Sequence, residues 1–244
     1  MMSNIKYHLG QKKRINKDMI DNTHPLVKVP SSAIYLLEYF DSLGYNVRIH
    51  EDWDHLKNLL ESQEDYPFDM DAAFTKDYML ESNIAFAMYL KKGDNIIATY
   101  AAKDLHPAVV REGLTDLYPN LIMEKLPDIL NLDDFQYYYS SCQWVHSDHL
   151  GKKLGVSLDL LKKHIIFDSI GGDVNYAIHR INDSMKAYHI NKLHYSDSET
   201  FAKQDEYGSG LGGAGGERDR EYNIVWTIKD SFQTKVEDIK STYK

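Results

Sequence analysis

Several short runs of apolar residues, some continuous and one alternating with polar residues, are typical of β-strands. The runs 84–90 and 96–102 are separated by Lys-Lys-Gly-Asp-Asn. In that segment Gly93, Asp94 and Asn95 tolerate positive φ, so the pattern predicts an antiparallel hairpin. Further strands are expected over 45–50, 135–146, 174–181 and 222–228.

Helical spacing is clearest after the strand that ends at residue 146. Leu154, Leu158, Leu161 and Ile165 recur at intervals of four, three and four, which places them on one face of a helix. Earlier in the chain, Ser31 or Ser32 can cap a helix that Gly44 ends. Helices are also expected over 53–60 and from 182 or 183 to 193.

The order of these elements is a hairpin followed by strand, helix, strand, helix and strand. Such alternation predicts an α/β fold with a central mixed sheet, partly parallel and flanked by helices. Residues 1–30 are polar and basic and are interpreted as an N-terminal extension, and residues 31–244 as a single domain. A glycine-rich loop at 208–216 contains G-x-G-x-x-G but lacks the preceding strand and following helix of a dinucleotide site. We interpret it as a flexible loop that could close over a substrate.

Charge and cysteine content exclude some classes of function and some locations in the cell. The 244 residues include 28 Lys and Arg against 37 Asp and Glu, for a net charge of −9, which argues against binding nucleic acid. The single cysteine fits a reducing compartment, and no apolar run suggests a signal sequence or a membrane span. The sequence therefore predicts a cytoplasmic protein without membrane partners.

Residues 143–161 contain the pattern with the most chemistry. A strand ends, a short polar loop turns, and a helix begins. The start of a helix presents unpaired N–H groups and the positive end of its dipole, which favour a phosphate. Gly151 and Gly155 let the backbone approach a ligand, and a bound pyrophosphate would stabilise Lys152 and Lys153 at this helix end.

This segment resembles the signature of the GNAT superfamily of acyl-CoA-dependent N-acyltransferases. The family pattern has a strand, then Arg or Gln, two residues, Gly, one residue, and Gly or Ala before a helix. In this chain Leu150 stands where Arg or Gln is usual and Lys153 where the first Gly is usual, while Gly151, Lys152, Leu154 and Gly155 fit the pattern. The resemblance implies a GNAT-like fold and acetyl-CoA, or another acyl-CoA, as the cofactor. The implied cofactor-binding residues are Trp144, Val145, His146, Leu150, Gly151, Lys152, Lys153, Leu154, Gly155 and Asn182.

A second, downstream resemblance supplies a candidate acid. Family members have a strand, an Asn, a short helix with a Tyr, and then Leu-Gly-Phe. Asn182 matches the Asn, and 193–195 stands in for the last motif. The family's Tyr, which protonates the departing CoA thiolate, falls at Ile190, so the acid role is assigned to the nearby Tyr188. His146, at the strand end, is the candidate general base.

The function expected from the resemblance is direct acetyl or acyl transfer to an amine on a small molecule or peptide. Alternatives are a non-catalytic acyl-CoA-binding regulatory domain, a GNAT-fold transferase that uses aminoacyl-tRNA, and an α/β interaction protein. The group His146, Asp148 and His149 suggests metal ligands, but ligands so close in one loop seldom converge, and no metal is expected. The other expected partner is a second copy of the chain, as a homodimer.

Overall fold

The computed structural model describes residues 29–50, 84–117, 121–180, 183–204 and 221–243. The helix expected over 53–60, the glycine-rich loop, Asn182 and the extension up to residue 28 lie outside these residues.

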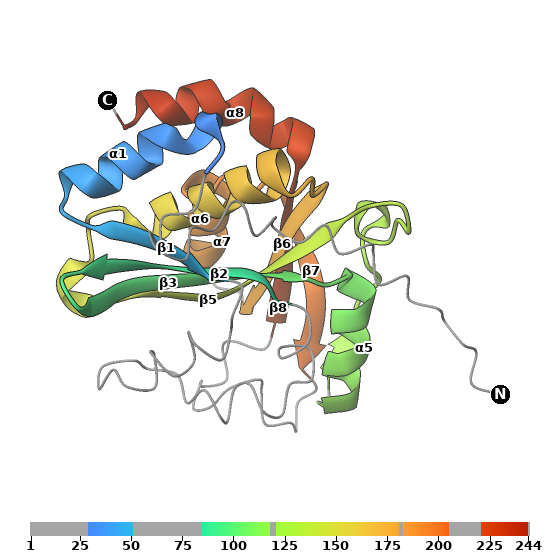
Figure 1. The fold of residues 1–244 in the computed structure, drawn as a ribbon. Helices are drawn as coiled ribbons and strands as arrows, with labels where there is room; N and C mark the ends of the chain where they lie inside the picture. The colour runs from blue at the N-terminus through green and yellow to red at the C-terminus, as the bar shows by residue number, and fades with distance from the viewer. Residues whose placement is uncertain (1–28, 51–83, 118–120, 181–182, 205–220, 244) are drawn as a thin grey trace.

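An eight-stranded sheet forms the centre of the molecule, with strand order β1-β2-β3-β5-β6-β8-β7-β4 (Figure 1). Neighbouring strands are antiparallel except β5 and β6, which are parallel. The mixed sheet expected from the sequence is therefore confirmed. The strands are β1 Asn46–His50, β2 Ile84–Lys92, β3 Asn95–Asp104, β4 Leu121–Met123, β5 Tyr137–Val145, β6 Val174–Arg180, β7 Asp197–Gln204 and β8 Glu221–Ile228.

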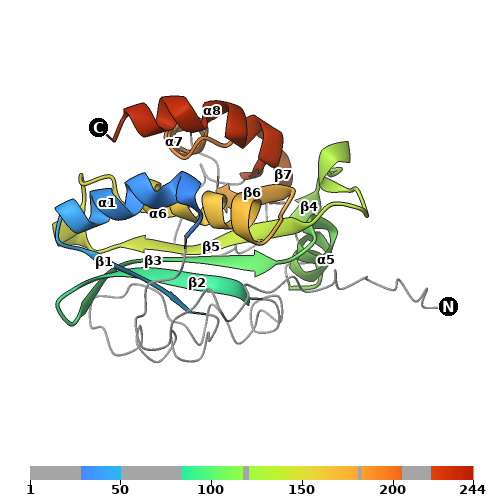
Figure 2. The same ribbon diagram turned by 45° about the horizontal axis from the view of Figure 1, so that its top comes forward.

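Helices cover both faces of the sheet (Figures 1 and 2). On one face lie α1, α6, α7 and α8, and α5 lies on the other. No helix within the described ranges is long and apolar enough to cross a bilayer. The helices are α1 Ile34–Ser42, α5 Pro107–Leu117, α6 Leu154–His164, α7 Asp183–Asn191 and α8 Lys229–Ser241.

Each face of the sheet has its own apolar core. Under α1, α6 and α8, side chains from across the described chain pack together, including Phe40, Phe86, Leu158 and Phe232. On the α5 face, Val110 and Leu114 of the helix pack against aromatic residues of the strands. Burial on both faces explains why β3 reads as an almost continuous apolar run.

The hairpin and the helix after residue 153 form as the sequence predicts. Lys92 pairs with Asn95 across a turn in which Gly93 has a φ of 62°. The strand expected over 135–146 is observed as Tyr137–Val145, and the Gln136 carbonyl oxygen just before it accepts the N–H groups of 173 and 174. The structure adds α5, β4, β7 and α8. β4 has only three residues, and the sequences of β7 and α8 are largely polar, whereas α5 begins at Pro107, which reads locally as a break.

Candidate functional site

The strands β5 and β6 run side by side only at their amino-terminal ends. Their parallel register joins residues 137–139 to 174–176, and no further pair between them is present in the described strands. From there β5 continues along β3, where Val145 lies opposite Ala98, while β6 continues along β8. A strand edge without a neighbour presents N–H and C=O groups that a ligand can pair with. Beyond residues 139 and 176 the two strands are no longer paired, and this unpaired stretch is called the opening between β5 and β6 below.

A buried polar cluster occupies the start of this opening. Ser140 Oγ accepts a hydrogen bond from Asn175 Nδ2 at 2.9 Å and lies 3.0 Å from the Tyr195 hydroxyl. Lys162 Nζ donates to the same Ser140 oxygen at 2.5 Å. Asn175 Nδ2 also donates to the Tyr138 carbonyl oxygen, at 2.8 Å. These four side chains, Ser140, Lys162, Asn175 and Tyr195, are called the Ser140 cluster below.

The cluster is joined to a buried group of charges on α6. Asp159, Lys162 and Lys163 have no solvent-exposed surface. Asp159 accepts from Lys162 at 2.6 Å and from Lys163 at 2.5 Å, and Lys163 also donates to the Leu193 carbonyl oxygen. The Lys162 ammonium lies 4.2 Å from the centre of the Tyr100 ring, a cation–π contact.

Burial and pairing shift the protonation of this group in opposite directions. Burial by itself would raise the pKa of Asp159, but the charges and hydrogen bonds of the two lysines outweigh it and lower that pKa to about 2. Burial lowers the pKa of Lys162 to about 7, against the opposing effect of Asp159. Asp159 is therefore ionised at neutral pH, whereas Lys162 has both protonation states within reach.

The loop 146–153 links the far end of β5 to α6. His146 Nδ1 accepts the Asp148 N–H at 3.2 Å and closes a single turn of 3₁₀ helix. Gly151 and Lys153 both have left-handed backbones, with φ of 80° and 52°. Lys153 stands where the GNAT pattern usually has Gly, and a residue with a Cβ adopts this conformation at a cost of about 1–2 kcal/mol.

The amino terminus of α6 leaves its first amides without partners inside the helix. Lys153 is the N-cap residue of α6, and its side chain forms no capping hydrogen bond. The first intrahelical bond runs from the Ser157 N–H to the Lys153 carbonyl oxygen, at 2.8 Å. The N–H groups that precede Ser157 in the first turn have no intrahelical acceptor, and the helix dipole adds partial positive charge there. This end of α6 therefore favours an anion.

Tyr39 of the first helix and Tyr45, which directly precedes the first strand, hold the loop in place. The Tyr39 hydroxyl donates to the Lys152 carbonyl oxygen at 2.8 Å. The Tyr45 hydroxyl lies 2.6 Å from His149 Nδ1 and accepts from Lys152 Nζ at 3.3 Å. Burial, together with the charge of Lys152, lowers the pKa of His149, which keeps its ring neutral and able to accept from Tyr45.

Gly155 and Tyr188 meet beside β5. A Cβ added to Gly155 would lie 3.2 Å from Gln143 Nε2, 3.3 Å from Val145 Cγ2 and 3.8 Å from the Tyr188 hydroxyl. Burial, and secondly the charge of Asp159, raise the pKa of Tyr188, and they outweigh the opposing effect of its hydrogen bond with Gln143. The Tyr188 phenol is therefore protonated at neutral pH.

The structure brings most of the sequence-predicted residues to one region. Leu150, Gly151, Lys152 and Lys153 are exposed along the loop, and Leu154 and Gly155 are buried in the first turn of α6. Trp144, Val145 and His146 are half-buried at the end of β5, where the His146 ring lies edge-on to the rings of Trp144 and His149. The proximity of Tyr188 to Val145 and Gly155 agrees with its assignment to this region. The roles of these residues stay predictions, and Asn182 lies outside the described residues.

The Ser140 cluster and the buried charges are residues that sequence reasoning missed. Asp159 and Lys163 lie opposite the leucine face of the same helix and Lys162 lies at its border, which is a usual pattern of charges on a solvated face. They are buried because other elements enclose that side of α6, and Lys163 reaches the Leu193 carbonyl beyond α7. The only local signal is the spacing of an acid and two bases at i, i+3 and i+4.

Comparison with known proteins gives no match to a family model and none to a curated protein. Solved structures do match. One is the spermidine/spermine N-acetyltransferase SpeG from Vibrio cholerae in complex with manganese ions, with a TM-score of 0.47 and 8% identity over 79% of this chain and 97% of that one. Another is NAA60 from Arabidopsis thaliana in complex with acetyl-CoA, with a TM-score of 0.45 and 8% identity over 76% and 99% of the two chains.

A third match is an acetyltransferase from Bacillus subtilis in complex with CoA, with a TM-score of 0.42 and 12% identity over 75% of this chain and 98% of that one. A GNAT family acetyltransferase from Elizabethkingia anophelis is also among the matches. Solved acetyltransferases, one of them described as a GNAT family member, are thus among the structures to which this chain is similar.

Proposed function

We propose that this protein is an acyl-CoA-dependent N-acyltransferase that moves an acetyl or other acyl group directly to an amine. The observation that carries the proposal is the opening between β5 and β6, with the uncapped end of α6 and Tyr188 beside it. Each of these features can serve acyl transfer from a thioester: strand amides can polarise the carbonyl, a helix amino terminus can hold phosphate, and a protonated phenol can supply a proton. The amine acceptor would be carried by a small molecule or a peptide.

The residues of the loop and of α6 fit the pyrophosphate of an acyl-CoA. The first-turn amides of α6 and the exposed Lys152 and Lys153 would hold the phosphates. The missing side chain of Gly155 leaves the backbone close to Gln143 and Val145, so a ligand between the loop and β5 could approach the helix. The acyl-CoA would supply an activated thioester.

The chain's own groups would then orient the thioester and move protons. Backbone N–H groups of β5 beyond its pairing with β6 would polarise the thioester carbonyl. As the acceptor amine forms the C–N bond, its proton would pass to His146 or to water. Tyr188 would donate its phenolic proton to the sulfur as the C–S bond breaks, and its raised pKa keeps that proton available at neutral pH.

One observation favours the non-catalytic alternative, an acyl-CoA-binding regulatory domain. The side chains of the Ser140 cluster fill the start of the opening and hydrogen-bond to one another. Their polar atoms therefore do not require a substrate to complete their hydrogen bonds. Binding of CoA without turnover of any amine would favour this second function. The expected homodimer and cytoplasmic location stay predictions.

The first test is calorimetric titration with CoA and acetyl-CoA. Lys153→Glu places a negative charge at the proposed phosphate position and should weaken binding at least about tenfold. Lys125→Glu makes the same change at an exposed lysine on the other face of the sheet and should leave binding unchanged. Absence of CoA binding by the unaltered protein would overturn the proposal.

The second test separates binding from chemistry. Release of free CoA is followed with a polyamine, a lysine-containing peptide and a peptide with a free amino terminus as acceptors. Tyr188→Phe should lower kcat about 10²-fold or more while the Kd for CoA stays unchanged. An unchanged kcat would remove Tyr188 from the acid role.

A further inference from the structure

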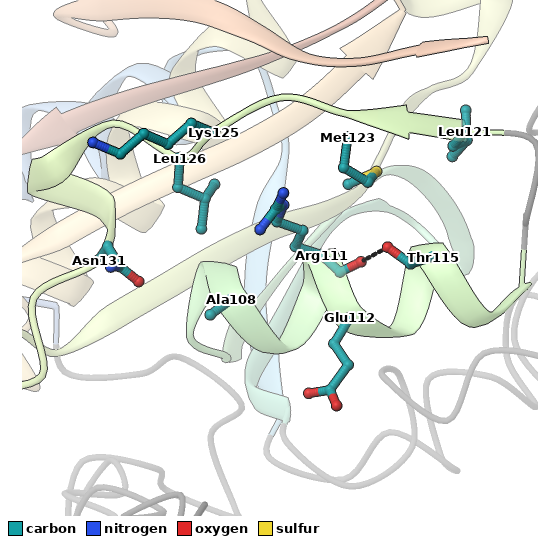
Figure 3. A pocket seen from close by; sticks show the side chains of 9 residues that line it. All are labelled: Ala108, Arg111, Glu112, Thr115, Leu121, Met123, Lys125, Leu126 and Asn131. Atoms are coloured by element: carbon teal, nitrogen blue, oxygen red, sulfur yellow. Dashed lines mark hydrogen bonds between the residues drawn. The ribbon is translucent and has the colours of Figure 1, made fainter. Parts of the chain in front are cut away.

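A cavity of about 540 Å³ lies on the α5 face, between α5 and the segment 121–131 (Figure 3). Cavities of this size are typical of small-molecule sites. It is separate from the loop 146–153 and from α6, which lie on the opposite face of the sheet.

The cavity contains the Arg111 guanidinium, whose Nε has no hydrogen-bond partner among the described residues. Arg111 reaches from α5 into the space beside the 121–126 segment, and its Nε is buried without a hydrogen bond. Among the residues that the structure describes, no carboxylate forms an ion pair with Arg111. An unpaired polar group in this position is costly, because it has lost water without gaining a protein partner.

The other charged side chains around the cavity do not pair with Arg111. Glu112 is on the same helix but points away from the segment 121–126 (Figure 3). Lys125 is exposed and forms its ion pair with Asp128 at 3.2 Å. The interior of the cavity therefore carries a single positive charge, that of Arg111.

The remaining lining combines an apolar wall with a few polar groups. Leu121 and Leu126 are buried, and Met123 lies beside them. Asn131 is exposed and lines the cavity as well, where its amide can bond to a ligand. The Thr115 hydroxyl donates to the Arg111 carbonyl oxygen at 2.8 Å, which leaves its oxygen free to accept.

We propose that this cavity binds a small organic carboxylate with an apolar body, anchored by a bidentate ion pair with Arg111. The planar guanidinium matches a carboxylate in geometry, and one negative charge balances the one positive charge of the interior. A doubly charged phosphate would leave one charge unbalanced beside the leucines. The apolar body would pack on Leu121, Met123 and Leu126. The proposal does not depend on acyl transfer.

The test uses 4-phenylbutanoate as the probe, with 4-phenylbutanol and phenyl phosphate as matched ligands. Binding is measured by calorimetry and by amide chemical-shift changes in the full chain. The acid should bind saturably, at least about tenfold more tightly than the alcohol, with shift changes in α5 and 121–131. Equal binding of acid and alcohol, or tighter binding of the phosphate, would overturn the assignment of a carboxylate site.

Variants separate the anchor from the wall. Arg111→Met should lose at least about tenfold in affinity for the acid and leave the alcohol unchanged, and Arg111→Lys should retain only part of the affinity. Lys125→Met, which removes the exposed lysine of the lining, should bind the acid as the unaltered protein does.

Thermal unfolding provides a second readout. Because the guanidinium is unpaired, Arg111→Met should keep or raise the Tm in the absence of ligand. The acid should raise the Tm of the unaltered protein and not that of Arg111→Met. A lower Tm for Arg111→Met without ligand would indicate a structural role and overturn the proposal, as would an equal ligand-induced shift in both proteins.

Discussion

At the scale of single residues, buried ionisable groups set the chemistry of the α6 face. Asp159 is held between Lys162 and Lys163 with no access to water. A buried ion pair of this kind contributes little net stability compared with apolar residues, but losing one partner leaves an uncompensated charge. The Asp159 carboxylate therefore neutralises the buried charge of both lysines.

Replacing this carboxylate tests that dependence. Asp159→Asn keeps the shape and leaves two buried lysines without a counter-charge, so the free energy of unfolding should fall by about 3–5 kcal/mol. Urea unfolding measures the change. Asp128→Asn breaks the exposed pair with Lys125 and should change stability by at most about 1 kcal/mol. Similar small effects for both variants would contradict the buried triad.

A second residue-scale prediction concerns His179. Burial, and secondly the neighbouring His189, lower the pKa of His179 from 6.5 to about 4, and its two ring nitrogens are buried without hydrogen bonds. Between these two pKa values the unfolded chain binds more protons than the folded one, so this contribution to stability falls as pH decreases from 6.5 towards 4.

Urea unfolding at several pH values in this window checks the sign. His179→Phe can stack on His189 without titrating, so its stability should decrease less with falling pH than that of the unaltered protein. Near neutral pH the variant should be as stable or more so, because no buried ring nitrogen is left unpaired. Parallel pH curves for the two proteins would show that His179 does not contribute to the slope.

At the scale of elements, the approach of α6 to the sheet depends on two glycines that sit in different environments. Gly155 in the first turn faces the movable end of Gln143. Gly172, which precedes β6, lies against Tyr138, and a Cβ there would be 2.7 Å from Tyr138 Cε2 and 2.6 Å from Ile166 Cγ2. Neither of these buried side chains can withdraw without disturbing the core.

These environments predict different outcomes for the same substitution. Gly172→Ala should lower the free energy of unfolding by about 1–3 kcal/mol through overpacking. Gly155→Ala should stay within about 1 kcal/mol, because the gain in helix propensity offsets the tight contacts. Denaturant unfolding of both variants compares them directly, and a larger loss for Gly155→Ala would contradict the packing described here.

At the scale of the whole molecule, the carboxy-terminal helix completes a core that begins with the first helix. Phe232 and Ile239 of α8 join the same apolar cluster as Phe40 of α1 and Leu158 of α6. Tyr243 packs edge-on against Tyr35 and Tyr39 and reaches Ser157 with its hydroxyl, at 3.0 Å. The two ends of the described chain thus stabilise α6 jointly.

Truncation of one side chain tests this long-range closure. Phe232→Ala should lower the free energy of unfolding by about 3–5 kcal/mol, because Phe232 is fully buried. Ile122→Ala, at an exposed site on β4, should change it by at most about 0.5 kcal/mol. Measured by denaturant unfolding, an equally small loss for Phe232→Ala would mean that α8 is not part of the core.

The sequence by itself determined the elements whose signals are local. The β2–β3 hairpin follows from two apolar runs on either side of a turn at Gly93, and α6 follows from the spacing of its leucines. The loop 146–153 was located because a glycine pattern between a strand and a helix has a fixed physical meaning. The acid role of Tyr188 was assigned from the downstream family resemblance alone, and its proximity to Gly155 depends on how α7 packs.

Only the tertiary structure decided which polar residues are buried. Asp159, Lys162 and Lys163 have the sequence pattern of a solvated face, and the elements that enclose α6 determine that this face is dry. The separation of β5 from β6 is likewise set by strand pairing between distant segments. The cavity at Arg111 needs α5 and the segment 121–131 together. Burial and pairing are properties of segments brought together from far along the chain, and a local pattern of residues does not encode them.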